Sequence, residues 1–143
     1  MGIFDLSVEK LQGYGLVLLL SNIYKDKDGF FLYVFFVYER NKFAKIGRVT
    51  MRLGNSPDIQ YLGNIGYFIA KKHRGKNYAT NACNILFNYL KIHGINKVNI
   101  TVDLDNKASQ RVCEKLGGVQ SGLVKHGNNV KIVYTMSFAR GVC

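Results

Sequence analysis

The chain has 143 residues, and its 20 Lys and Arg residues against 9 Asp and Glu give a formal net charge of +11. This length fits one compact domain over residues 1–143 and leaves little room for a second. Because 48% of the residues are hydrophobic, the chain can bury a core, which excludes wholesale disorder. The longest purely aliphatic run, Leu16 to Leu20, is too short to span a bilayer, and no secretory signal is recognisable. We therefore expect a soluble cytoplasmic domain with no membrane partner.

The positive charge has two explanations at this stage. It suits a partner that carries phosphates, either a nucleic acid or a phosphate-bearing cofactor. The chain is also rich in Lys and Asn, a bias that arises without selection for any partner. Three widely spaced cysteines, Cys83, Cys113 and Cys143, form no Cys-x-x-Cys pair, so we expect reduced thiols, no disulfide framework and no metal site.

The first half of the chain is rich in strand patterns. Residues 1–15 show no assignable pattern, whereas residues 16–24 read as a strand. Residues 30–39 are aromatic and β-branched and lie between turn residues, which predicts a strand buried on both faces. Residues 44–53 are predicted to be its antiparallel partner across a short turn.

A further strand and a basic loop follow. Residues 60–70 are predicted as a third strand that contains Gly63 and Gly66, and glycine in a strand often marks a bulge or a close backbone approach. Residues 71–76, Lys-Lys-His-Arg-Gly-Lys, form a basic loop after it.

Two helices flank the next strand. The apolar spacing predicts a helix from about Tyr78 to His93, ended by Gly94. Residues 97–102 alternate as a strand, and either Asp105 or Asn106 caps a second helix.

The chain closes with a hairpin formed by residues 119–124 and 130–138. This order of elements predicts an α+β fold, a mixed and mostly antiparallel twisted sheet covered by helices. The segment from Gln60 to Val102 requires a right-handed crossover between parallel neighbours.

The most informative stretch is residues 66–80, in which a strand enters a tight basic loop that opens an amphipathic helix. The first turn of such a helix has free backbone N–H groups and the positive end of the helix dipole, so it can hold a phosphate. Gly75 allows close approach of an anion, and Arg74 and Lys76 add charge. Asn77 tolerates a left-handed conformation at a place where glycine is usual. Taken alone, this stretch favours a solvated loop with a routine helix cap over a phosphate site.

A second element downstream, residues 106–118, runs Asn-Lys-Ala-Ser-Gln-Arg-Val-Cys-Glu-Lys-Leu-Gly-Gly. Together the two elements resemble the GNAT (GCN5-related N-acetyltransferase) superfamily, and in particular its ribosomal-protein-acetyltransferase-like branch. There an Arg/Gln-x-x-Gly-x-Gly/Ala loop precedes one helix and an Asn-x-x-Ser…Glu-Lys-Leu-Gly pattern forms the other. Here the loop matches at Arg74 and Ala79 but has Asn77 in place of glycine. The resemblance covers residues 60–118 closely and the terminal hairpin loosely, and no recognised motif falls in residues 1–29.

The resemblance implies an α/β/α GNAT-like fold with a splayed parallel strand pair and a site for acetyl-CoA. A bulged strand would offer backbone groups to the pantetheine arm, and the loop and helix start would hold the pyrophosphate. Asn106 would bond the arm or order the loop beside it. The residues that the resemblance assigns to acetyl-CoA are Tyr67, Phe68, Ile69, Arg74, Gly75, Lys76, Asn77, Tyr78, Ala79, Thr80 and Asn106.

The catalytic groups are less well marked by the resemblance. Family members often place a glutamate base five residues before the helix asparagine, where this chain has Thr101, and Asp103 would act only through water. Many members place a tyrosine acid seven residues after the asparagine, at the position of Cys113. Ser109 is the alternative proton donor in the branch that the chain resembles. Cys113 and Ser109 are therefore the candidate catalytic residues, although Cys113 also reads as a core residue and Ser109 as a capping residue.

The resemblance thus predicts an acetyl-CoA-dependent N-acetyltransferase that moves an acetyl group to the primary amine of a small molecule or peptide by direct attack on the thioester. Two alternatives remain: a catalytically impaired acyl-CoA-binding protein, and a basic module that associates with RNA or the ribosome. A nucleic-acid partner is disfavoured because the basic residues outside the loop are scattered along the chain. The last strand pair is placed to extend a sheet between the subunits of a homodimer.

Overall fold

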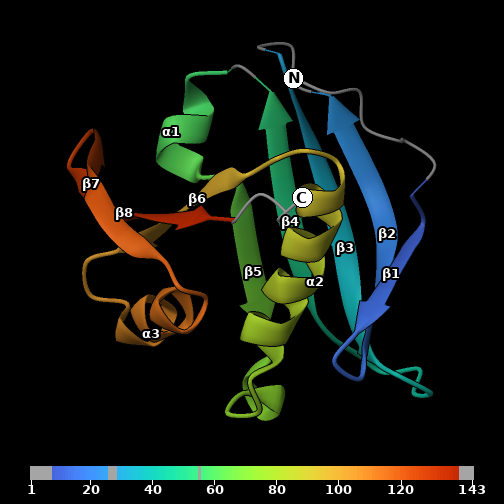
Figure 1. The fold of residues 1–143 in the computed structure, drawn as a ribbon. Helices are drawn as coiled ribbons and strands as arrows, with labels where there is room; N and C mark the ends of the chain where they lie inside the picture. The colour runs from blue at the N-terminus through green and yellow to red at the C-terminus, as the bar shows by residue number, and fades with distance from the viewer. Residues whose placement is uncertain (1–7, 26–28, 55, 139–143) are drawn as a thin grey trace.

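Two antiparallel sheets form the framework of the structure, a computed structural model that describes residues 8–25, 29–54 and 56–138 (Figure 1). The larger sheet has the order β1-β2-β3-β4-β5 and the smaller one the order β6-β8-β7. The strands are β1 (Lys10–Gly13), β2 (Leu16–Lys25), β3 (Phe30–Glu39), β4 (Lys45–Gly54), β5 (Ile65–Ile69), β6 (Lys97–Asp103), β7 (Val119–His126) and β8 (Asn129–Ser137). The predicted α+β class with antiparallel sheets and flanking helices is confirmed.

The central hairpin of the larger sheet, β3 and β4, follows the sequence pattern closely. From Tyr33 to Val37 every second side chain of β3 is buried, namely Tyr33, Phe35 and Val37, whereas the intervening ones are only half-buried. The prediction that this strand is buried on both faces is therefore wrong. Side chains alternate across a strand, and the ring of Phe36 on the second face lies 4.1 Å beneath the ammonium of Lys45.

The predicted third strand is divided into a short helix and a short strand. Residues 58–62 form helix α1 (Asp58–Leu62), and β5 begins only at Ile65. The hydroxyl of Ser56 accepts the N–H of Asp58 at 3.2 Å, and Gly63 ends the helix with φ 78°. Such a short helix lacks the length over which an apolar period can be recognised.

The bulge expected in this strand is absent, since β5 pairs with β4 in unbroken register from Ile65 to Ile69. Close packing accounts for Gly66 instead. A Cβ at Gly66 would stand 2.8 Å from the hydroxyl oxygen of Thr50 on β4.

Helix α2 (Tyr78–Ile92) lies across the larger sheet, as Figure 1 shows, and forms the centre of the core. Its bounds confirm the predicted helix, and Gly94 follows with φ 83°. A 3₁₀ turn, η1 (Lys71–His73), occupies part of the predicted basic loop. The buried side chains of α2 are Ala82, Cys83, Ile85, Leu86, Phe87 and Leu90.

Helix α3 (Lys107–Lys115) is capped by Asn106, whose side-chain oxygen accepts the N–H of Ser109 at 3.1 Å. This contact decides between the two predicted caps. The terminal hairpin is also confirmed, with β7 and β8 meeting across a turn at Gly127. Strand β1, which the sequence left unassigned, pairs along β2, while residues 1–7 lie outside the described part of the chain. No helix in the described ranges is long and apolar enough to cross a membrane.

Strands β5 and β6, predicted as parallel neighbours, belong to different sheets. Asn64, just before β5, joins them. Its backbone N–H donates to the carbonyl of Asn99 at 2.8 Å, and its side-chain oxygen accepts the N–H of Asn99 at 2.9 Å. The Asn64 amide also donates to the carbonyl of Arg52 on β4 at 3.1 Å. A Cβ at Gly63 would stand 3.0 Å from the backbone nitrogen of Thr101, which explains the glycine beside this junction.

Candidate functional site

A cavity of about 470 Å³ lies where β5 ends, between the loop that follows it and the two long helices. Its walls come from β5, the basic loop, the first turn of α2 and one face of α3. The lining residues are Tyr67, Phe68, Ile69, His73, Arg74, Gly75, Asn77, Tyr78, Ala79, Thr80, Asn106, Ala108, Ser109, Arg111, Val112 and Lys115. We call this the helix-side cavity.

The predicted cofactor residues converge on this cavity, with one exception. The ammonium of Lys76 lies 6.0 Å over the ring of Tyr78, and Lys76 is outside the lining set. Sequence reasoning did not assign Arg111 and Lys115 to the site. Their positions could have been found from helical spacing, because Ala108, Arg111, Val112 and Lys115 recur at three and four residues on one face of α3.

One edge of β5 is open towards the helix-side cavity. At the two ends of β5, the N–H of Arg52 donates to the carbonyl of Asn64, and the N–H of Ala70 donates to the carbonyl of Ile46. Asn64 and Ala70 therefore direct their backbone groups towards β4. In an antiparallel ladder the bonded pairs alternate, so the backbone groups of Tyr67 and Ile69 face away from β4. The carbonyl of Ile69 already accepts the Arg74 Nε–H at 2.8 Å.

The side chain of Phe68 is the other feature of this edge. Phe68 is 45% exposed, and the guanidinium groups of Arg48 and Arg74 lie 5.2 Å and 5.6 Å from the centre of its ring. The backbone groups of Phe68 are directed towards β4 and are not available to a ligand. Phe68 therefore contributes to the cavity wall through its ring.

The loop and the first turn of α2 form a cradle of donors. Gly75 has φ 83° and Asn77 has φ 61°, so the predicted left-handed conformation of Asn77 is confirmed. No side chain caps this end of α2 among the described residues, and the N–H groups of its first turn have no partner inside the helix. The ammonium of Lys115 reaches across from α3 and donates to the Asn77 side-chain oxygen at 2.8 Å.

His73 adds an unsatisfied group to the same wall. Its Nε2 atom is buried and has no hydrogen-bond partner within the described ranges. A buried polar atom without a partner is costly. An oxygen-rich ligand at the start of α2, such as a diphosphate, would supply that partner and would also meet the free N–H groups of the helix.

A second cavity of about 310 Å³ opens on the other side of β5 and is lined by β4, β5, β6 and β8. We call it the sheet-side cavity. It shares Tyr67, Phe68 and Ser109 with the helix-side cavity. Its other lining residues are Arg48, Thr50, Arg52, Leu62, Ile65, Gly66, Ile100, Thr101, Val102 and Lys131.

Comparison with known protein families assigns the chain to one of them. The Acetyltransferase (GNAT) domain matches residues 9–119, which is most of the chain. The chain belongs to the GNAT acetyltransferase family. The match also includes β1 and β2, which lie before the segment that carried the sequence resemblance.

Individual relatives agree with this assignment. Over 76 residues the GNAT chain is 33% identical to a Bacillus subtilis (strain 168) protein named "Putative ribosomal N-acetyltransferase YdaF", covering 52% of this chain and 42% of that protein. The fold resembles a ribosomal-protein-serine acetyltransferase structure from Vibrio cholerae, itself described as putative, with a TM-score of 0.67, 16% identity and coverage of 90% and 97% of the two chains. It also resembles the microcin C7 self-immunity acetyltransferase MccE in complex with acetyl-CoA and AMP, with a TM-score of 0.60, 23% identity and coverage of 75% and 61%. The match to the Bacillus subtilis protein thus spans less than half of that protein's length.

The two candidate catalytic residues of this GNAT chain lie in different surroundings. Ser109 is half-buried at the junction of the two cavities, and its carbonyl accepts the hydroxyl of Tyr67 at 3.3 Å. Cys113 is fully buried and lines neither cavity. Burial raises the pKa of the Cys113 thiol to about 12, although its hydrogen bond with Tyr67 acts in the opposite direction. Burial likewise raises the pKa of Tyr67.

No carboxylate appears among the lining residues of either cavity in the part of the chain that the structure describes. Thr101, at the position where the family often has glutamate, lines the sheet-side cavity, and its hydroxyl donates to the carbonyl of Tyr61 at 2.8 Å. Asp103 is exposed at the end of β6. Within the described ranges, no group of three or more His, Cys, Asp or Glu residues is arranged to hold a metal ion. Cys143 lies outside those ranges.

Proposed function

We propose that this chain is an acetyl-CoA-dependent N-acetyltransferase that acetylates the primary amine of a small molecule or peptide. The observation that carries the proposal is the meeting of two cavities at Tyr67, Phe68 and Ser109. One cavity ends in a cradle of anion-binding groups, and the other is a separate chamber from which an amine can approach the same point. Family membership and the acetyl-CoA held by MccE in its complex support this assignment of the two cavities.

The helix-side cavity would hold acetyl-CoA along its length. The free N–H groups at the start of α2, with His73 and Arg74, would bind the diphosphate. The outward carbonyl of Tyr67 and the outward N–H of Ile69 would pair with the amides of the pantetheine arm as an added strand does. The acetyl group would then lie near Ser109, where the cavities join.

The transfer itself forms one bond and breaks one bond. The neutral amine attacks the acetyl carbonyl carbon, a C–N bond forms, the C–S bond breaks, and CoA leaves as the thiol. The outward N–H of Tyr67 would donate to the carbonyl oxygen as negative charge develops on it. Ser109 is better placed than Cys113 to pass a proton to the sulfur, because it lines both cavities and the buried Cys113 lines neither. The amine would lose its proton to water, since no carboxylate lines the described cavities.

That lack of a lining carboxylate favours a second candidate, a protein that binds acetyl-CoA without catalysing transfer. The two functions differ in a simple measurement. Both predict that acetyl-CoA binds to the helix-side cavity, and only the first predicts that CoA is released when an amine is added. The cytoplasmic location and a homodimer built through the terminal hairpin are further parts of the proposal.

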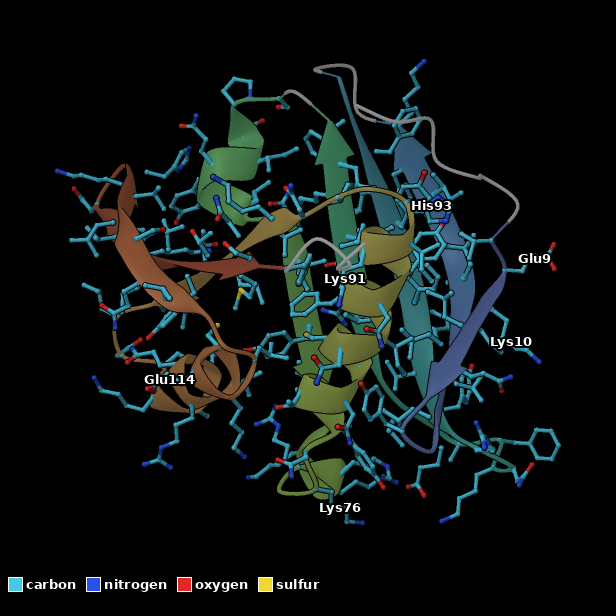
Figure 2. All side chains as sticks on the ribbon, viewed as in Figure 1. Glu9, Lys10, Lys76, Lys91, His93 and Glu114 are labelled. Atoms are coloured by element: carbon cyan, nitrogen blue, oxygen red, sulfur yellow. The ribbon has the colours of Figure 1, made fainter. Side chains whose placement is uncertain are left out.

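The test begins with acetyl-CoA binding measured by titration calorimetry. The double variant Arg74→Ala with Lys76→Ala should weaken binding by about 1–3 kcal/mol, chiefly through the lost charge-assisted contact of Arg74 with a phosphate, because Lys76 is outside the cavity lining. Lys91→Ala is the matched control, because Figure 2 shows Lys91 at the other end of α2 from Lys76. Unchanged affinity in the double variant would refute the placement of the diphosphate. Release of free CoA with a panel of amines then separates enzyme from binding protein.

A further inference from the structure

The sheet-side cavity has a strongly one-sided charge. Arg48 and Arg52 from β4 and Lys131 from β8 line it, and the rest of its described lining is apolar or uncharged. Cations that converge in a cavity without carboxylates attract an anionic ligand. The three side chains come from strands of two different sheets, so their convergence is a property of the fold.

Arg52 is a half-buried cation of this cavity. Its backbone N–H donates to the carbonyl of Asn64, and its carbonyl accepts the side-chain amide of Asn64. Because Asn64 also bonds to Asn99 on β6, these bonds fix Arg52 at the junction of β4, β5 and β6. One guanidinium nitrogen lies 3.8 Å from the place where a Cβ at Gly66 would stand, so the group rests against β5. The Arg52 guanidinium is partly withdrawn from solvent, yet the described residues provide no carboxylate within ion-pair distance of it. Removing a charge from water without a partner is costly.

The other two cations rest on aromatic rings. The guanidinium of Arg48 lies 5.2 Å from the centre of the Phe68 ring, and the ammonium of Lys131 lies 4.6 Å from the centre of the Tyr61 ring. Asp103 faces Lys131 in the register of β6 and β8, but the two make no ion pair. Aromatic faces orient cations without neutralising them, so both groups keep their charge for a ligand.

We propose that the acceptor is a small primary amine that also carries an anionic group, a phosphate or a carboxylate. This inference rests on the proposed acetyl transfer and narrows its substrate. The anionic group binds Arg52, Arg48 and Lys131, and the amine points to the junction at Ser109. There its nitrogen forms the C–N bond as the C–S bond of the thioester breaks, and CoA leaves as the thiol. A volume of about 310 Å³ is at the lower end for small-molecule sites, which favours a small metabolite over a folded or extended polypeptide.

The test uses pairs of amines that differ only in the charged group. Phosphoethanolamine is compared with ethanolamine, and β-alanine with its uncharged amide, so that the phosphate and carboxylate sources are tested separately. Because a charge-assisted contact is worth about ten- to hundredfold, kcat/KM for at least one anionic amine should exceed that of its neutral partner by about that factor. Equal use of both members of both pairs would overturn the inference, as would preference for an acidic peptide over both small anionic amines.

Variants locate the effect in the cavity. Arg52→Gln and Lys131→Gln should each lower kcat/KM for the anionic amine more than for its neutral partner, and so remove most of the preference between the two. Lys10→Gln is the control, since β1 is at the opposite edge of the larger sheet from β5, as Figure 2 also shows. If Arg52→Gln does not fold, Lys131→Gln on β8 provides the same comparison. A preference that survives in Lys131→Gln and in a folded Arg52→Gln would contradict this site.

A binding measurement separates this inference from the proposed function. With the protein saturated by CoA, so that the anion cradle at α2 is filled, phosphoethanolamine or β-alanine should bind in calorimetry and the neutral partner should not. Such binding without any CoA release from acetyl-CoA would refute the enzymatic function while supporting the anionic specificity of the cavity. CoA release with neutral amines, together with no binding of either anionic amine, would support the enzymatic function and refute the anionic specificity of the cavity.

Discussion

The substitution Asn64→Ala tests the junction that holds the two sheets together beside the site. The Asn64 side chain makes two hydrogen bonds to backbone groups of different strands. It accepts from the N–H of Asn99 on β6 at 2.9 Å and donates to the carbonyl of Arg52 on β4 at 3.1 Å. Alanine removes both contacts and leaves their partly buried backbone partners unpaired.

The expected cost follows from the number of groups affected. A typical hydrogen bond contributes about 0.5–1.5 kcal/mol net, and an unsatisfied buried partner raises the loss to about 1–3 kcal/mol. With two bonds in a partly buried place, Asn64→Ala should lower the free energy of unfolding by about 2–4 kcal/mol. Acetyl-CoA affinity should also fall, because Asn64 sets the separation between β5 and β6.

Urea denaturation measures the stability change directly. Asn88→Ala is the matched control, since Asn88 is exposed on α2 and should change the free energy of unfolding by no more than about 0.5 kcal/mol. If Asn64→Ala is as stable as the wild type within that margin, the junction does not hold the sheets as argued. A stable variant with weakened acetyl-CoA binding would likewise refute the energetic part of the reasoning.

Three further predictions concern individual side chains. Ser109→Ala should lower turnover with little effect on acetyl-CoA affinity, whereas Cys113→Ala should leave turnover nearly intact; steady-state kinetics would contradict this if the two effects were reversed. Asn77→Gly should change acetyl-CoA affinity by less than about 0.5 kcal/mol, because relief of the left-handed backbone offsets the lost bond from Lys115, and a large loss in calorimetry would show that the amide has another role. Burial raises the pKa of the Cys113 and Cys83 thiols, so the folded chain keeps protons that the unfolded chain loses above their ordinary value of 9.0. The free energy of unfolding from urea titrations should therefore fall as pH rises above about 9, and a constant value up to pH 11 would contradict the burial argument.

Some features of the site could be predicted because they depend on neighbours in the sequence. Apolar spacing predicts α2, and alternation and turn residues predict the hairpin of β3 and β4. Asn77 was identified as the residue that tolerates a left-handed backbone, and Asn106 as one of two helix caps. The convergence of the predicted cofactor residues on one cavity follows from the same local order of strand, loop and helix.

Other features were missed because their signals are short or distant. Helix α1 and strand β1 are too short to show a period, so the first was assigned to a strand and the second to no element. The half-burial of one face of β3 depends on what covers that face, which the strand's own composition does not reveal. Lys76 looks like a loop cation in the sequence, and only its placement over Tyr78 shows that it lies outside the cavity lining.

The sequence by itself thus determined most of the local elements and, through its motifs, the resemblance to the GNAT family and the basic loop that opens α2. Tertiary structure alone decided how β5 and β6 separate into two sheets, because that depends on hydrogen bonds between Asn64 and strands far away in the chain. The tertiary structure also decided where some of the positive charges behind the net charge of +11 lie. Arg48, Arg52 and Lys131 are scattered in the sequence, and packing of β4 against β5 with β8 nearby brings their charges into one cavity.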